Sequence, residues 1–232
     1  MSAIYQRNLK VRAEHVDYRQ NMKLSSFMTL FQECCIAHTE ELGMGRDMTL
    51  DRGFLWVIIS EHIVINRMPV YDEDIILECY QTPTLHYFFP RSLIVKNDKG
   101  EVLIKAVALW SLIDSKTRQF IDPQENKIII KETLKDDIVM PVIGLKVPAL
   151  NNKKTFTASY SKVDINGHLG NTYYMDLMND IMFEKEAKDI KEIKLIFKKE
   201  IQFNARFAVN FSQINNKFYF KSKYFESEFT FK

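Results

Sequence analysis

The chain has 232 residues, of which 46% are hydrophobic and 27% are charged, and its formal net charge is +2 at pH 7. These values are typical of a globular protein of one large or two small domains. Nucleic-acid-binding domains usually carry a clear basic excess, and membrane-spanning helices need about 20 consecutive apolar residues. Since the sequence has neither, we expect no nucleic-acid partner and no membrane span.

The beginning of the chain, "MSAIYQRNLKVRAEH", lacks the charged and then apolar pattern of a secretory signal. We therefore expect a cytoplasmic protein. The cysteines are Cys34, Cys35 and Cys79, and an odd, unevenly spaced set indicates reduced thiols rather than a disulfide framework.

A metal site or a cofactor is not expected either. The five histidines are scattered, and Cys34, Cys35 and His38 share one apolar helix face without an evident fourth ligand. The seven glycines form neither a phosphate-binding loop nor a dinucleotide fingerprint.

Apolar residues recur at three- and four-residue steps from Leu24 onward, and this spacing predicts a long amphipathic helix that ends at Gly43 or Gly45. Four runs rich in β-branched and aromatic residues follow: "FLWVIISEHIVINR", "DIILECYQT", "HYFFPRSLIVKN" and "EVLIKAVALWSLID". Turn signals such as Pro69 separate them. The first half is thus predicted to be a lone helix followed by an antiparallel meander.

The second half repeats this plan. It begins with a predicted strand "KTFTASY" and a helix from about 171 to 185, and then offers the strand candidates "IKLIFKKEIQF", "RFAVNFSQI", "KFYFKSKYF" and "SEFTFK". Prolines punctuate the stretch between the halves. We therefore expect a first domain over 1–130, a linker over 131–150 and a second domain over 151–232.

A register check supports an internal duplication. A shift of 147 residues sets Val16-Asp17 on Val163-Asp164 and matches the two apolar helix faces: Phe27 with Tyr174, Leu30 with Leu177, Phe31 with Met178, and Cys34 with Ile181.

The same shift exposes one difference between the copies. The second copy has Asp164, Asn166 and His168 within five residues. At the last two of these positions the first copy has Arg19 and Asn21. A purely structural turn should suit both copies about equally, so the difference favours a function for the second.

Two interpretations of this polar cluster are open. Asn166-Gly167 is a common turn dipeptide, and Asn171 or Thr172 could cap the next helix, so the cluster could be only a turn with a half-buried histidine. Alternatively, the helix start and Asn166 could stabilise an oxyanion while His168 exchanges protons and Asp164 orients them.

A catalytic interpretation also needs a nucleophile. The chain has no G-x-S-x-G elbow, so water would have to be activated by a base. Glu200 is the candidate because it interrupts an apolar strand, although a solvent-facing glutamate beside Lys198 and Lys199 would look the same. A thioester would suit such a site, since a thiol with a pKa of about 8.5 leaves readily as the thiolate.

The residues resemble the acyl-acyl carrier protein thioesterases, the plant plastid and bacterial enzymes that release fatty acids during synthesis. Asp164-x-Asn166-x-His168, followed by Asn171 and Tyr174, is similar to the D-x-N-x-H-x-x-N-x-x-Y signature of that family. The segment "IFKKEI" resembles its strand with a glutamate, and segments of the first half are similar in order and spacing, so the resemblance covers nearly the whole chain.

The resemblance implies an α+β fold, a tandem or double hotdog, in which a curved antiparallel sheet wraps each of two long helices. It implies hydrolysis of fatty acyl-acyl carrier protein (acyl-ACP) to free fatty acid, with acyl carrier protein as the partner and no cofactor. By the same resemblance Asp164, Asn166, His168 and Glu200 form the catalytic set, and the first unit shapes the acyl chamber.

Two departures from the family pattern matter. Plant members often have cysteine directly after the glutamate, and here that residue is Ile201, which favours a water mechanism. No transit peptide is evident, which suggests a bacterial protein or a mature form.

The alternatives are an acyl-CoA thioesterase of the same fold, a hotdog dehydratase acting at a double bond, and a non-catalytic acyl-binding protein. The lysines between Lys185 and Lys199 alternate with acids and are expected to form a solvated face, although a basic rim at the site would favour the acidic carrier protein. A monomer and a homodimer are equally compatible with the sequence.

Overall fold

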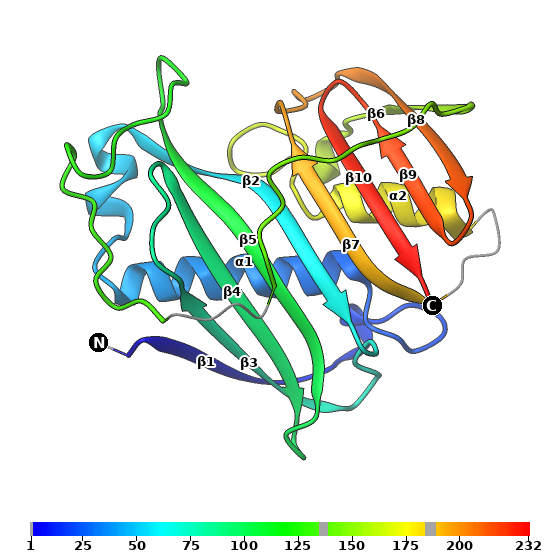
Figure 1. Cartoon of the computed structure of the whole chain (residues 1–232), viewed down its shortest axis with the longest axis horizontal. Helices are drawn as coiled ribbons and strands as arrows, with labels where there is room; N and C mark the ends of the chain where they lie inside the picture. Colours follow the sequence, from blue (N-terminus) through cyan, green and yellow to red (C-terminus); the bar gives the residue numbers. More distant parts are fainter. Residues whose placement is uncertain (1, 135–138, 184–188) are drawn as a thin grey trace.

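A computed structural model describes residues 2–134, 139–183 and 189–232 (Figure 1). The strands of these residues form one sheet, in the spatial order β1-β3-β4-β5-β2-β7-β10-β9-β8-β6. The bounds are β1 (Ile4–Lys10), β2 (Phe54–Ile65), β3 (Asp74–Gln81), β4 (Phe88–Asn97), β5 (Val102–Asp114), β6 (Asn152–Thr157), β7 (Ile190–Phe197), β8 (Arg206–Ile214), β9 (Lys217–Lys221) and β10 (Phe225–Phe231).

The strand order is symmetric about the centre of the sheet. Reading outward, β2-β5-β4-β3-β1 on one side matches β7-β10-β9-β8-β6 on the other, strand for strand in chain order. The two halves meet where β2 and β7 pair antiparallel, with Ser60 opposite Ile196 and Val64 opposite Glu192. The duplicated plan expected from the sequence is therefore present in the topology.

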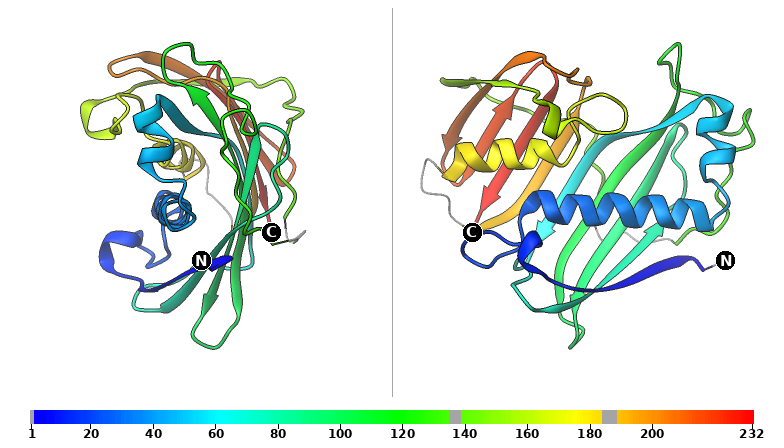
Figure 2. Two further views of the ribbon diagram at one scale, coloured as in Figure 1. Left: turned by 90° about the vertical axis from the view of Figure 1, so that its left-hand side faces the viewer. Right: turned by 180° about the vertical axis from the view of Figure 1, so that it is seen from behind.

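Two helices, α1 (Leu24–Glu41) and α2 (Tyr173–Phe183), lie against the same face of the sheet, which curves around them (Figure 2). The apolar face predicted for the first helix is buried. That helix stops just before Gly43, which adopts φ +73°, a conformation that glycine takes without steric cost. For the second helix the predicted end at Lys185 lies outside the described residues. This arrangement is the tandem hotdog that the sequence led us to expect.

Three details of the predicted strands were wrong. β1 was not predicted, and the four runs of the first half do not form a simple meander, because β2 pairs with β5 and not with β3. β7 ends at Phe197, before Glu200. It ends there because the N–H groups of Lys198 and Lys199 both point to the carbonyl of Tyr224, 2.7 and 3.2 Å away, which breaks the regular ladder.

The stretch 139–150, which leads into the second half, crosses the sheet face opposite the helices (Figure 1). Its contacts include the carbonyl of Met140, 2.7 Å from Nδ1 of His62 on β2. The domain limits at 130 and 150 stay a prediction. Neither helix of the described residues is long and apolar enough to cross a bilayer.

Candidate functional site

The polar cluster of the second unit lies in a tight turn before α2. The N–H of Asp164 donates to the carbonyl of His168 (2.8 Å), and its carboxylate Oδ1 accepts the N–H of Asn166 (2.8 Å). Gly167 closes the turn with φ +79°. The sequence therefore builds this turn around an aspartate that organises backbone groups, which is the usual role of an Asx turn.

The first unit contains the same turn. The N–H of Asp17 donates to the carbonyl of Asn21 (2.8 Å), and its Oδ1 accepts the N–H of Arg19 (2.9 Å). Gln20 takes φ +65° at the place of Gly167. Because the backbone is equivalent with Arg19 in place of Asn166 and Asn21 in place of His168, the turn alone does not account for His168 or Asn166.

The second turn packs beside the loop that follows β7. The N–H of Leu169 donates to the carbonyl of Ile201 (2.8 Å), and this contact brings Nε2 of His168 to 3.4 Å from Oε2 of Glu200. Only 17% of the His168 side chain is exposed, against 37% for Glu200. The imidazole is thus largely shielded from water, whereas the carboxylate faces an open cavity.

The equivalent backbone contact in the first unit shows which residue there occupies the position of Glu200. There the N–H of Met22 donates to the carbonyl of Pro69 (2.8 Å), so Met68 occupies the position that Glu200 has in the second unit. The histidine and glutamate pair therefore occurs in one unit only.

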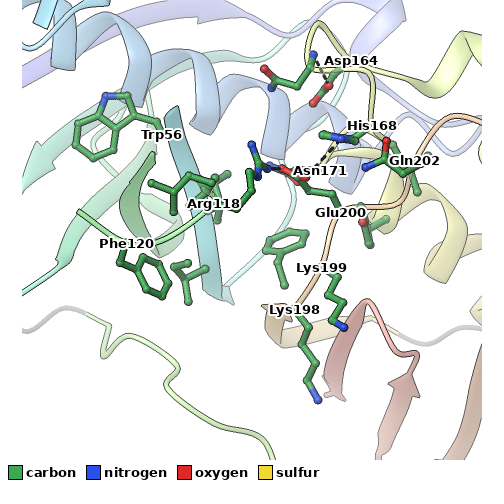
Figure 3. Close-up of a pocket in the computed structure, with 18 residues that line it drawn as sticks. Trp56, Arg118, Phe120, Asp164, His168, Asn171, Lys198, Lys199, Glu200 and Gln202 are labelled. Atoms are coloured by element: carbon green, nitrogen blue, oxygen red, sulfur yellow. Dashed lines mark hydrogen bonds and ion pairs between the residues drawn. The ribbon is translucent and has the colours of Figure 1, made fainter. Parts of the chain in front are cut away.

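Arg118 is a site residue that sequence reasoning missed. It follows β5 in the first unit, and its Nη2 forms an ion pair with Oε1 of Glu200 (Figure 3). No local pattern marks this arginine, which stands in an ordinary polar turn, "SKTRQ". It becomes visible only when the two halves are packed together.

These groups border a cavity of about 480 Å³ at the junction of the units. β2, the end of β5 and the loop after it supply one side, and the turn, the start of α2 and the loop after β7 supply the other. The lining includes all four predicted site residues, Asp164, Asn166, His168 and Glu200, together with Asn171, Gln202, Arg118 and Trp56.

Part of the lining of this cavity is aromatic and closely packed. Tyr174 on α2 is 2% exposed, and its ring packs edge-on against Phe197 and Phe225, with centroids 5.3 and 5.1 Å apart. Burial, and then the negative charge of Glu200, raises the pKa of the Tyr174 hydroxyl, which therefore stays neutral.

A second cavity, of about 370 Å³, lies in the first unit between α1 and the sheet. Trp56 lines both cavities and packs edge-on against Phe89, with centroids 4.9 Å apart. Ile165, from the turn that carries Asn166, also reaches this second cavity. An apolar chamber thus adjoins the polar pocket.

The thiols stand apart from the polar pocket. Cys34, Cys35 and Cys79 are buried in the first unit, and none of them lines the larger cavity. Ile201, directly after Glu200, is fully buried. Among the described residues no three histidine, cysteine, aspartate or glutamate side chains lie together as metal ligands would.

The polar pocket thus supplies the carboxylate of Glu200, the imidazole of His168 in contact with it, and the amide of Asn166 in the turn before α2. These parts can activate water and stabilise an oxyanion, as an acyl-transfer site requires.

Comparison with known proteins identifies the family of both halves. The family model of the acyl-ACP thioesterase N-terminal domain matches residues 2–128, and that of the acyl-ACP thioesterase C-terminal domain matches residues 146–227. A chloroplastic dodecanoyl-[acyl-carrier-protein] hydrolase of Cinnamomum camphora is 23% identical over 188 residues, which cover 75% of this chain and 49% of the relative. The chain thus spans about half the length of the curated relatives it matches.

Solved structures share the fold. An acyl-ACP thioesterase from Bacteroides thetaiotaomicron matches with a TM-score of 0.89 at 20% identity and covers 99% of this chain and 98% of its own. The 12:0-ACP thioesterase from Umbellularia californica matches with a TM-score of 0.81 at 18% identity and covers 99% and 97%.

Proposed function

The chain belongs to the acyl-ACP thioesterase family, and we propose that it hydrolyses the thioester of a fatty acyl-ACP at the pocket between its two units. The observation that carries the proposal is the contact of His168 with Glu200, 3.4 Å apart, in a cavity that adjoins an apolar chamber. The first copy has the same turn without this pair, so the pair is best explained by chemistry and not by folding.

In the proposed reaction Glu200, aided by His168, takes a proton from water as the water oxygen adds to the thioester carbonyl. The 3.4 Å separation is long for a hydrogen bond, as catalytic contacts often are before substrate binds. When the tetrahedral intermediate collapses, the C–S bond breaks and the thiolate leaves with the proton that the base had taken. The products are a free fatty acid and the carrier thiol.

The negative oxygen of the intermediate needs donors. The Asn166 side chain supplies one, and the start of α2 supplies N–H groups and a partial positive charge. Asp164 acts through the backbone, since its carboxylate holds the N–H of Asn166 (2.8 Å) and thereby fixes where that side chain begins.

The acyl chain would occupy the second cavity. Its walls are mainly apolar, including Met44, Leu50, Phe89 and Trp110, and Trp56 separates it from the polar pocket. The unit over 1–130 would then hold the acyl chain, the unit over 151–232 would supply the catalytic residues, and 131–150 would link them.

Acyl carrier protein is acidic, so its docking would need cations around the pocket. Lys198 and Lys199 line the cavity; Lys198 is paired with Glu226 (2.7 Å), whereas no described acid is paired with Lys199. Lys194 is paired with Glu192 (3.2 Å), and Lys185 and Lys188 lie outside the described residues. Among the described residues, few unpaired lysines therefore lie beside the pocket, and Lys199 is the main candidate for a contact with acyl carrier protein.

Thiol release from matched acyl-ACP and acyl-CoA substrates tests the carrier. We expect faster release from acyl-ACP and a rate that falls with added salt, because salt screens charge-guided docking. Lys199→Glu should weaken the acyl-ACP reaction more than the acyl-CoA reaction, because the carrier protein presents the larger acidic surface. Equal rates on both carriers would instead favour the acyl-CoA thioesterase, and binding without release would favour a non-catalytic acyl-binding protein. Conversion of hydroxyacyl or enoyl substrates without thiol release would indicate a dehydratase.

Glu200→Gln tests the base. The change keeps the shape of the side chain but removes its ability to take a proton, so turnover should fall by about a hundredfold or more. A variant with near-normal turnover would remove Glu200 from the mechanism.

The cytoplasmic location, the bacterial source, and the choice between monomer and homodimer stay predictions.

A further inference from the structure

The turn after β5 is built to hold Arg118 in one place. Oδ1 of Asp114 accepts the N–H groups of Lys116 (2.9 Å) and Thr117 (2.7 Å), and the N–H of Arg118 donates to the carbonyl of Asp114 (2.9 Å). The same donors, Thr117 first, lower the pKa of the Asp114 carboxyl and keep it charged. The position of Arg118 is therefore set by a fixed turn and not by a mobile loop.

The backbone of Arg118 is in an unfavourable conformation. Its φ is +60°, in the left-handed region that glycine adopts freely and other residues adopt at a steric cost. A glycine would complete the same turn with less strain. Strain at a non-glycine residue is often retained where the side chain has a function.

The side chain crosses from the first unit to the second. Its Nη2 contacts Oε1 of Glu200, and the other carboxylate oxygen, Oε2, faces Nε2 of His168. The two side chains of this ion pair are 38% and 37% exposed, and an ion pair at such exposure adds little to stability. Stability alone therefore does not explain why the turn accepts the strain.

We propose that Arg118 is a positioning residue for the Glu200 carboxylate and that the catalytic site is complete only with this contribution from the first unit. The guanidinium holds one carboxylate oxygen so that the other is directed to His168 and the cavity. This inference rests on the proposed function, in which Glu200 is the base.

Four variants distinguish the effect of the Arg118 side chain from the effect of the strained turn. Arg118→Gly removes the guanidinium and suits the positive φ, whereas Arg118→Ala removes the guanidinium and retains the strain. Arg118→Lys keeps the charge but lacks the planar fork that matches a carboxylate. Lys116→Ala removes an exposed positive charge from the same turn and is the matched control.

We expect Arg118→Gly and Arg118→Ala to lower kcat for acyl-ACP by about 10- to 100-fold with a much smaller change in KM, since a misplaced catalytic group costs rate more than binding. Arg118→Lys should recover part of the loss, and Lys116→Ala should stay within twofold of wild type. In a Glu200→Gln background, Arg118→Gly should cost less than twofold more, because the residue acts through that carboxylate.

Normal kcat in Arg118→Gly would overturn the inference, and so would losses that multiply in the double variant. Both outcomes require an active wild type, so they are distinct from failure of the proposed function, in which wild type releases no thiol.

An NMR measurement tests the positioning role even if the wild type releases no thiol. The ring signals of His168 in NMR spectra, identified by their loss in His168→Ala, should move in Arg118→Gly and stay in place in Lys116→Ala. Unmoved signals in Arg118→Gly would contradict the positioning role.

Discussion

Glu61 is a buried acid outside the proposed site, and it should make the stability of the protein depend on pH. The residue lies on β2 beneath α1 and is 2% exposed, and its Oε2 has no hydrogen-bond partner among the described residues. Burial, with a smaller contribution from Cys35, raises the pKa of the Glu61 carboxyl to about 8. At neutral pH the folded protein therefore carries this glutamate protonated.

The sign of the effect follows from the two pKa values. In the unfolded chain a glutamate ionises near pH 4.5, while in the folded protein it keeps its proton until about pH 8. The contribution of Glu61 to stability is therefore full below pH 4.5, falls as the pH rises between these values, and is lowest above pH 8. Each pH unit in this range costs about 1.4 kcal/mol, so the loss reaches about 3 kcal/mol at pH 7.

Glu61→Gln should remove this loss. Glutamine has nearly the same shape and no charge, so the variant and wild type should unfold at similar urea concentrations at pH 5. At pH 8 the variant should be the more stable by several kcal/mol, of the order of the calculated loss. Glu125→Gln, at an exposed glutamate, is the control and should follow wild type at both pH values.

Urea unfolding monitored at several pH values is the assay. Parallel stability curves for Glu61→Gln and wild type across pH 5 to 8 would contradict the raised pKa of Glu61, because they would mean that this carboxyl ionises inside the folded protein without cost.

Three further substitutions test the duplicated turn and the proposed acyl chamber. Gln20→Gly should raise the free energy of unfolding in urea by up to about 1 kcal/mol, because it relieves a positive φ. Gly167→Ala should lower the free energy of unfolding by at least as much, and equal stabilities would mean that the positive φ carries no cost at these positions. Trp56→Ala should join the two cavities and shift thiol release toward longer or bulkier acyl chains, so an unchanged chain-length profile would place the acyl group elsewhere.

Local patterns predicted the parts of the fold that depend on neighbouring residues. α1 was evident from apolar residues at helical spacing, because that spacing puts them on one buried face. The repeat of the helix faces indicated the duplication, which the symmetric strand order confirms.

The pairing of strands far apart in sequence could not be predicted from local patterns. The run before Pro69 gave no sign that β2 would cross to β5 and also pair with β7 at the centre of the sheet. β1 was missed because a short strand with mixed polar and apolar residues, at the edge of the sheet, has little local signal.

The site shows the same division. The sequence singled out His168 and Glu200, and packing brings them to 3.4 Å, although Glu200 lies in a loop and not in the predicted strand. Asp164 was selected with them, but its turn recurs around Asp17, so its backbone contacts are structural in both copies. Arg118 could not be found from sequence spacing, since it stands 82 residues from its partner.

We infer that one of two equivalent turns has become catalytic through its side chains. The most direct test is the rate of thiol release from acyl-ACP by His168→Ala, measured beside Asn21→Ala, the same change at the matching position of the first turn. We expect His168→Ala to lose nearly all activity and Asn21→Ala to keep it. Equal rates for the two variants, whether both high or both low, would show that the two turns do not differ in catalysis.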